Sequence, residues 1–266
     1  MSSRKIEIAQ IQLTYPARAR SAPVEALAGV SCTVAVGELV SIVGPSGCGK
    51  TSLLRILAGL EHATDGSFRI HTSDLQRPTV SMVFQQAGLF PWLTVEQNVA
   101  YGLQMRGLAK AQRLDIAQHW LRAMGLERFR TAYPAQLSGG MQQRVGLARA
   151  FAYNGEVLLM DEPFGALDAQ TRLELQQVLL EQYEQADQTV LIVTHSIEEA
   201  LTLSDRVLIM SARPGRILAE VAVPFARPRD AIALRSDPAF SALVADIWGV
   251  LRSEVERART AELTAA

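Results

Sequence analysis

Three short runs of apolar residues punctuate the chain, each bounded by polar residues or glycine. They cover residues 39–43, 157–160 and 190–193. Continuous apolar runs of this length are typical of strands that are buried on both faces of a parallel sheet. We therefore predict an α/β fold on a largely parallel sheet, in which ligands bind beyond the carboxyl ends of the strands.

A helix-rich segment, from about residue 94 to residue 152, separates the first two runs. Thr94 stands three residues before Gln97, the spacing of a capping box, so a helix is expected to begin there. Further along, apolar residues recur at helical spacing. These are Leu114, Ala117, Leu121 and Met124. The segment predicts a helical subdomain over about 90–152.

The last part of the chain changes character. Pro224, Pro228 and Pro238 mark an irregular connection, and an amphipathic pattern follows from residue 240 to residue 255. We predict one domain over residues 5–235, into which the helical subdomain is inserted, and a C-terminal helical tail over residues 236–266.

Composition narrows the class of protein. The 266 residues are 48% hydrophobic and 20% charged, with a net charge of -1, which is typical of a globular chain and gives no bulk reason to bind nucleic acid. The two cysteines, Cys32 and Cys48, are too few for a disulfide framework and have no partners at metal spacing, so a reducing cytoplasm fits. No uncharged run approaches the length of a membrane span, so any membrane role is expected to come through a partner.

A glycine-rich loop follows the first apolar run and precedes a helical pattern. Strand, loop and helix then come in the order that a phosphate-binding loop requires, with backbone N–H groups converging at a helix N-terminus. The lysine is expected to reach the β- and γ-phosphates, and the hydroxyl of Thr51 to bind Mg²⁺. The loop consists of Gly44, Pro45, Ser46, Gly47, Cys48, Gly49, Lys50 and Thr51.

Two carboxylates, Asp161 and Glu162, follow the second apolar run. Alone, such a pair is usually a helix cap or a solvated turn. Beside a phosphate loop, the first suits coordination of Mg²⁺, and the second can act on an attacking water as a base or by positioning it.

A second hydroxyl and glycine cluster comes before another helical pattern. It comprises Ser138, Gly139 and Gly140. A simple serine cap is one interpretation, and a second phosphate-binding device is the other. Such a device would serve either the same nucleotide or one held by another copy, and the residues alone leave both open.

The ordered set of these motifs closely resembles the ATP-binding subunits of ABC transporters over nearly the whole chain. Besides the two glycine loops, it contains Gln85, the sequence Leu-Leu-Met-Asp-Glu-Pro ending at Pro163, Asp168 and Thr-His195. The resemblance implies a P-loop NTPase (RecA-like) core with an inserted helical subdomain and a small antiparallel β part at the N-terminus. It also implies that the chain binds and hydrolyses ATP, with Mg²⁺ bound beside the nucleotide.

The resemblance further implies roles for single residues. Ser138 and Gly140 of one copy would complete the site of a second copy in a head-to-tail homodimer. The others would act as follows: Glu162 as catalytic base, His195 on the γ-phosphate, Gln85 on Mg²⁺ and water, Asp161 on Mg²⁺, Asp168 in communication across the dimer, and Tyr15 in stacking on adenine. Aromatic residues near an N-terminus also often only pack. One departure is Met141, where many relatives have glutamine.

The loop 89–92, Leu-Phe-Pro-Trp, follows Gln85 and is either a docking surface or a contact that pins the helical lobe. In the family this region receives a helix from the membrane subunit, which implies two transmembrane permease subunits, an extracytoplasmic solute-binding protein and a place at the cytoplasmic face of the inner membrane.

Several stretches are similar to the nitrate, sulfonate and taurine branch of importers, and nearest to its taurine-importing members. They are 88–92, 101–105, 112–117, 161–168, 211–216 and 235–240. Taurine or a related sulfonate is the expected solute, with nitrate, bicarbonate or a thiamine-precursor-like solute as alternatives. A soluble ABC ATPase without a transport role is the remote alternative. Ribosome-acting members normally carry two nucleotide domains, and chromosome-maintenance members carry a long coiled coil. This sequence has the motifs of one nucleotide domain and lacks heptad repeats long enough for a coiled coil.

Overall fold

The computed structural model describes residues 3–17, 22–185 and 188–265. The chain forms two compact units: the first unit is residues 1–73 with 188–266, and the second unit is residues 74–187. The remaining residues, 1–2, 18–21, 186–187 and 266, lie outside the described part. They include short pieces of the predicted domain 5–235 and the last residue of the predicted tail.

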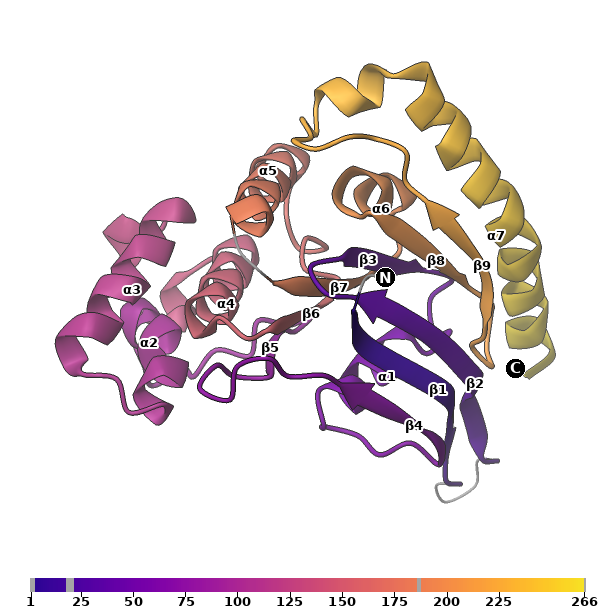
Figure 1. Cartoon of the computed structure of the whole chain (residues 1–266), viewed down its shortest axis with the longest axis horizontal. Coiled ribbons are helices and arrows are strands. Elements are labelled where there is room, and N and C mark those ends of the chain that lie inside the picture. The colour runs from indigo at the N-terminus through magenta and orange to yellow at the C-terminus, as the bar shows by residue number, and fades with distance from the viewer. Residues whose placement is uncertain (1–2, 18–21, 186–187, 266) are drawn as a thin grey trace. The chain divides into compact units, whose positions relative to one another are not determined.

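A mostly parallel sheet forms the centre of the first unit (Figure 1). Strand β3 pairs in parallel with β7 on one side and β8 on the other, and β9 pairs antiparallel with β8. The bounds are β3 (Leu39–Val43), β7 (Thr189–Thr194), β8 (Arg206–Met210) and β9 (Ile217–Ala222). Every residue of β3 and β7 is buried, which explains their apolar runs and confirms two of the three predicted strands.

A second, antiparallel sheet in the first unit has the strand order β2-β1-β4. It consists of β1 (Arg4–Tyr15), β2 (Val24–Ala35) and β4 (Asp65–Ile70). Ile6, Ile11 and Leu13 of β1 are buried, whereas the residues between them are mostly exposed, as expected of a strand with one face in the core. This sheet confirms the small antiparallel part expected at the N-terminus.

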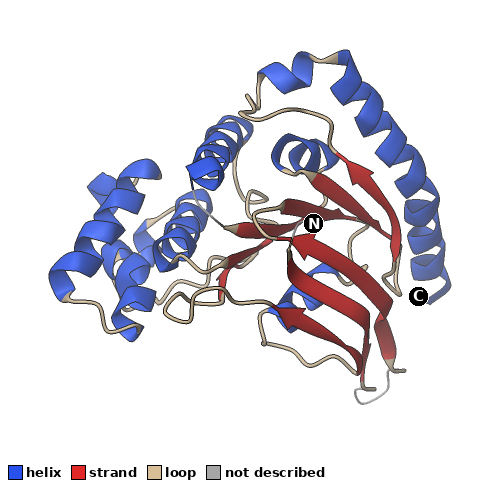
Figure 2. Ribbon diagram, viewed as in Figure 1, coloured by secondary structure: helices blue, strands red, loops and turns tan. Residues whose placement is uncertain are grey.

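The helices of the first unit include the one that ends the chain. They are α1 (Lys50–Leu57), α6 (Ile197–Leu203) and α7 (Pro238–Ala265), with a 3₁₀ turn at Ala233–Ser236. Phe240, Ile247 and Leu251 of α7 join a core cluster with Val43 and Val207. Figure 2 shows α7 as a long helix beside α6. The predicted terminal helix is thus confirmed, and it packs into the core of the first unit.

The second unit combines a parallel strand pair with four helices. The pair is β5 (Val80–Val83) and β6 (Val157–Asp161). The helices are α2 (Val95–Met105), α3 (Lys110–Ala123), α4 (Gly139–Tyr153) and α5 (Ala169–Gln185), with 3₁₀ turns at Glu127–Phe129 and Pro134–Gln136. Strand β6 is fully buried and confirms the third predicted strand.

Helix α2 begins as its sequence predicts. The hydroxyl of Thr94 accepts the Gln97 backbone N–H at 3.3 Å, and the Gln97 side chain accepts the Thr94 N–H at 2.9 Å, so the capping box is complete. In α3 and its C-cap, Ala117, Leu121 and Met124 are buried, which confirms the predicted apolar face. Across the described ranges, no helix combines the length and apolar character that a bilayer crossing requires.

Candidate functional site

The glycine-rich loop lies at the carboxyl end of the first unit's sheet, between β3 and α1. The sheet register pairs Val43 with Thr194 on one side and with Ile209 on the other. The loop therefore begins between His195, which is exposed at the end of β7, and Met210, which ends β8. His195 and the glycine-rich loop thus share one edge of the sheet, the carboxyl edge at which ligands bind in open α/β sheets.

The backbone of this loop adopts conformations that only glycine takes at low cost. Gly47 and Gly49 have φ angles of 73° and 101°, and Gly49 is the N-cap of α1. Lys50 is 6% exposed, and its Nζ donates to the carbonyls of Gly44 at 2.8 Å and Pro45 at 2.9 Å. The lysine ammonium is thereby held against the loop, at the N-terminus of a helix.

Close packing leaves no room for side chains at two of the loop glycines. A Cβ on Gly44 would approach the carbonyl of Met210 to 2.8 Å, and one on Gly49 would approach the carbonyl of Ala26 to 2.8 Å. A bare backbone, a helix N-terminus and a buried lysine together suit a group with anionic oxygens, so the donor set fits a nucleotide phosphate.

Cys48 sits within this loop but has the character of a packing residue. Its side chain is fully buried, and burial raises the pKa of the thiol above its ordinary value, with the nearby Lys50 charge opposing the rise only in part. The thiol stays protonated at neutral pH, so it is not expected to act as a nucleophile.

Tyr15, at the end of β1, lies against the helix that follows the loop. Its hydroxyl is 3.0 Å from the Ser52 hydroxyl on α1. The hydrogen bond places the tyrosine ring beside the loop although 36 residues separate Tyr15 from Ser52 in the chain. This position is compatible with both packing and contact with a ligand.

In the second unit, parallel pairing brings Gln85 and Glu162 together. Val83 of β5 pairs with Met160 of β6, so the residues that follow these strands lie at the same edge. The Gln85 side-chain amide donates to a Glu162 carboxylate oxygen at 3.0 Å. Asp161, the last residue of β6, is 3% exposed. An amide and two carboxylates thus lie together at the neighbouring ends of β5 and β6.

Glu162 also has an unusual backbone. Its φ is 45°, in the left-handed region that non-glycine residues rarely adopt, and its carbonyl accepts the Gly165 N–H at 3.1 Å. Such conformations cost roughly 1–3 kcal/mol and cluster at functional sites. Gln10 and Asn154 share this conformation, so the backbone of Glu162 agrees with its place in the motif but does not identify the residue alone.

The second glycine cluster begins helix α4. Ser138 is the N-cap, with its hydroxyl accepting the Met141 N–H at 3.3 Å, and Gly139 and Gly140 form the first turn. Ser138 and Gly139 are exposed, whereas a Cβ on Gly140 would lie 3.3 Å from the Leu167 side chain. A side chain at position 140 would therefore require the Leu167 side chain to shift by a few tenths of an ångström.

Asp168 follows at the start of α5. Its carboxylate accepts the Thr171 backbone N–H at 3.0 Å, and this bond lowers the pKa of the exposed Asp168 carboxyl. The side chain therefore caps α5 as an anion near neutral pH.

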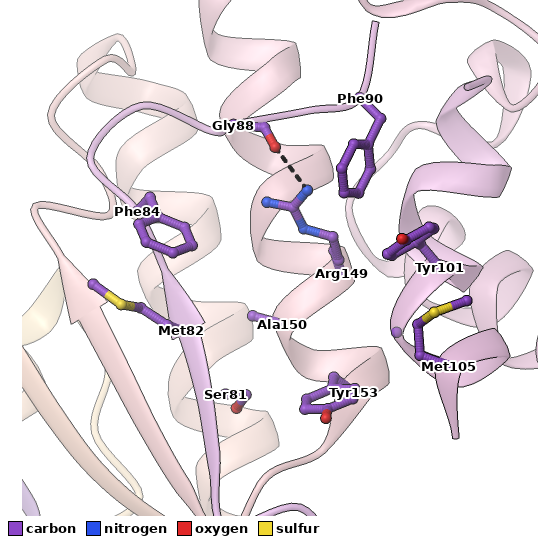
Figure 3. Close-up of a pocket in the computed structure, with 11 residues that line it drawn as sticks. Ser81, Met82, Phe84, Gly88, Phe90, Tyr101, Met105, Arg149, Ala150 and Tyr153 are labelled. Atoms are coloured by element: carbon purple, nitrogen blue, oxygen red, sulfur yellow. Dashed lines mark hydrogen bonds between the residues drawn. The ribbon is translucent and has the colours of Figure 1, made fainter. Parts of the chain in front are cut away.

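A pocket of about 350 Å³ lies within the second unit, between the loop after β5 and the helices α2 and α4. Phe84, Phe90, Tyr101 and Met105 form most of its apolar lining (Figure 3). The Phe90 and Tyr101 rings are 4.5 Å apart, and Trp92 beside them is 70% exposed. Much of this apolar surface is accessible to a partner.

Two polar residues that the motifs did not indicate hold this loop. Arg149 donates to the carbonyls of Ala87 at 2.6 Å and Gly88 at 2.9 Å, the second bond being drawn in Figure 3. Asn98 is fully buried and forms four bonds to the backbone of residues 90–94. A buried asparagine in an amphipathic helix was the only signal in the sequence, and it does not indicate which segment it binds.

Comparison with known proteins agrees with the geometry. Residues 27–165 match the family model described as ABC transporter. An uncharacterised ABC transporter ATP-binding protein of Methanocaldococcus jannaschii is 47% identical over 87% of this chain and 86% of its own length. The taurine import ATP-binding proteins of Escherichia coli K12 and Chromobacterium violaceum are 44% and 43% identical, over 82% and 92% of this chain and 88% and 96% of their own.

Solved structures show the same fold. An ATP-binding cassette determined as a dimer in a post-hydrolysis state, with ADP and phosphate bound, has a TM-score of 0.74 and 33% identity, covering 83% of this chain and all of that one. The expected P-loop NTPase fold with its small antiparallel sheet is confirmed. The chain therefore belongs to the ABC transporter family, as one of its ATP-hydrolysing, ATP-binding subunits.

Proposed function

We propose that this chain drives an importer for taurine or a related sulfonate. The observation that carries the proposal is the 43% identity with the Chromobacterium violaceum taurine import protein, which extends over 255 residues and 96% of that protein. The likeness thus continues past the nucleotide motifs, which all ABC ATPases share, into the C-terminal region. In this proposal the chain acts at the cytoplasmic face of the inner membrane, with two transmembrane permease subunits and an extracytoplasmic binding protein.

For ATP hydrolysis we propose that the loop amides and Lys50 bind the phosphates, and that Thr51, Gln85 and Asp161 hold Mg²⁺. The ion, when bound, would neutralise phosphate charge. Glu162 would orient or deprotonate the attacking water. The hydrogen bond from Gln85 to Glu162 supports this assignment because it restrains the carboxylate that must meet the water.

The remaining residues support the proposal that two copies act together. Ser138 and Gly139 are exposed at the N-terminus of α4, where the phosphates of a nucleotide bound to a second copy of the chain can approach. His195 would contact the γ-phosphate, Tyr15 the adenine, and Asp168 the facing copy. Two solved structures of one relative at 33% identity are dimers, which supports a homodimer here.

The pocket in the second unit is the proposed docking place for the membrane partner. Its lining is mostly apolar, and the loop beside it is held by Arg149, which also lines the pocket, and by Asn98, so the surface is ordered before a partner arrives. A preformed apolar pocket binds a partner helix without a large ordering cost. Its lining includes Phe84 and Gly88, which flank Gln85 in the chain, so the docking surface and this proposed Mg²⁺ ligand lie on one short segment.

A Met105→Asp substitution is expected to separate docking from chemistry. Met105 lines the pocket and is 61% exposed, so the charge is tolerated by the isolated subunit but disfavoured against an apolar partner. The amount of the subunit bound to the membrane and the ATPase rate stimulated by solute should each fall roughly 10-fold. The ATPase rate of the isolated subunit should change by less than about 2-fold.

The matched control for this substitution is Leu75→Asp. Leu75 is 95% exposed and lies outside the pocket, so it should assemble normally. Equal loss of assembly in both variants, or none in Met105→Asp, would refute the docking assignment.

The solute is tested by growth of the source organism with and without this gene. Sole sulfur sources would be taurine, other alkanesulfonates and sulfate, and nitrate would be the sole nitrogen source in a parallel series. The strain without the gene should fail to grow when taurine is the sole sulfur source, and it should grow again when the wild-type gene is restored. Loss on several sulfonates would widen the solute class, whereas loss on nitrate, or no loss at all, would contradict the proposal.

A further inference from the structure

The loop between β8 and β9, residues 211–216, packs against the phosphate-binding loop in the first unit. Gly215 at its end is buried, donates its N–H to the Ala26 carbonyl at 2.9 Å and accepts the Ala28 N–H at 3.1 Å. A Cβ on Gly215 would come closer than 3.0 Å to the Cys48 carbonyl oxygen and to the end of the Met210 side chain. The two loops therefore meet backbone to backbone.

The segment 48–49 of the phosphate loop is enclosed from two sides. Ala26 and Leu27 of β2 lie where a Cβ on Gly49 would stand, at 2.8 Å and 2.7 Å, and the same Ala26 carbonyl binds Gly215. Two glycines, one in each loop, thus allow three backbone segments to meet at one point. Neither can gain a side chain without displacing backbone, because a backbone carbonyl lies less than 3.0 Å from the added Cβ in both cases, that of Cys48 for Gly215 and that of Ala26 for Gly49.

The contact with Gly215 has a defined consequence for the phosphate loop. In a trans peptide the C=O and N–H groups point in opposite directions. The Cys48 carbonyl faces Gly215, so the Gly49 N–H, which shares that peptide plane, points away from Gly215. Any shift of the Cys48 carbonyl must therefore tilt the Gly49 amide, one of the donors in a loop that binds anions through its N–H groups.

The terminal helix holds the other end of the 211–216 loop. Glu254 of α7 is 5% exposed, and its carboxylate accepts the Ala212 N–H at 2.9 Å. The Ser211 hydroxyl accepts the Arg216 N–H at 2.9 Å, which closes the loop between these two contacts. A continuous series of bonds thus runs from α7 to the backbone that faces the phosphate loop.

We propose that Gly215 is a positioning residue for nucleotide binding: it sets the orientation of the Cys48–Gly49 peptide, and Glu254 of the terminal helix keeps Gly215 in place. Gly215 faces the Cys48 carbonyl, and its effect on nucleotide binding would come through the phosphate loop. The C-terminal helix thereby contributes to nucleotide affinity from outside the site.

The test is the affinity of Gly215→Ala for ADP, measured by isothermal titration calorimetry on the full chain. The dissociation constant should rise roughly 10-fold or more, since small misplacements of binding groups have effects of this size. Gly249→Ala is the control, because a Cβ there meets nothing within 4 Å, and its affinity should not change. A folded Gly215→Ala variant with a lowered Tm and an unchanged dissociation constant would show a merely structural role and would overturn the proposal.

Glu254→Ala keeps the proposal testable should Gly215→Ala fail to fold. Removing the carboxylate leaves the Ala212 N–H without this acceptor, and the dissociation constant for ADP should rise about 3-fold. Asp246→Ala, an exposed acidic residue on the same helix, should leave it unchanged. Equal affinities for Glu254→Ala and the wild-type chain would refute the link from the terminal helix to the phosphate loop.

Discussion

A Glu162→Gln variant is expected to bind ATP about as tightly as the wild-type chain and to hydrolyse it roughly 10²-fold more slowly, or slower still. Glutamine keeps the size of the side chain and an oxygen that can accept the hydrogen bond from Gln85, which is 3.0 Å long in the wild type. It loses the negative charge that a base needs. Single-turnover hydrolysis with saturating ATP separates the chemical step from binding.

Two comparisons make the Glu162 result decisive. Glu184→Gln changes an exposed glutamate of α5 in the same unit and should hydrolyse ATP at the wild-type rate. Near-normal hydrolysis by Glu162→Gln would remove Glu162 from the role of base. Weak ATP binding by that variant would instead assign the carboxylate to nucleotide affinity.

Lys50→Ala should lower ATP hydrolysis by about 10³-fold and weaken nucleotide binding at least about 10-fold. The lysine is both the buried cation of the phosphate loop and the donor to the carbonyls of Gly44 and Pro45. Its removal takes away charge and leaves two loop carbonyls without this donor. Fluorescence titration with a nucleotide analogue and a phosphate-release assay measure the two effects.

Lys110→Ala is the matched control for the Lys50 substitution, since Lys110 is exposed at the first position of α3. Its activity should equal that of the wild type. Lys50→Arg should not restore hydrolysis, because a planar guanidinium differs from a compact ammonium in the geometry of its donors. Wild-type turnover by Lys50→Ala would exclude the loop as the catalytic phosphate site.

The sequence predicted the strands that are buried throughout. The runs in β6 and β7 stand out because each is apolar from end to end, and the run in β3 stands out because Ser41 is its one polar residue. Strand β5 did not stand out, since it has only four residues, one of them a serine, and its burial is mixed. Strand β9 was missed because its residues alternate between half-buried and exposed at the edge of a sheet. Short strands and edge strands carry a weak hydrophobic pattern, and whether they form depends on the strands with which they pair.

The candidate site shows the same division between local and distant information. The phosphate loop was predictable because its spacing and the flanking strand and helix are contiguous in the chain. The hydrogen bond between Gln85 and Glu162 was not, because 76 residues separate them and only the pairing of β5 with β6 joins them. The packing of Gly215 against Cys48 likewise depends on the register of β8 with β3.

The left-handed backbone of Glu162 has a consequence for how this chain varies over evolution. With a φ of 45°, glycine or asparagine would suit the position better, so a glutamate there lowers the free energy of unfolding. Selection for stability alone would favour another residue, and the role in turnover that we propose for Glu162 would account for a glutamate there. A duplicated copy of this gene that no longer hydrolyses ATP would be free to replace residue 162, and such a copy would gain thermal stability as it lost activity.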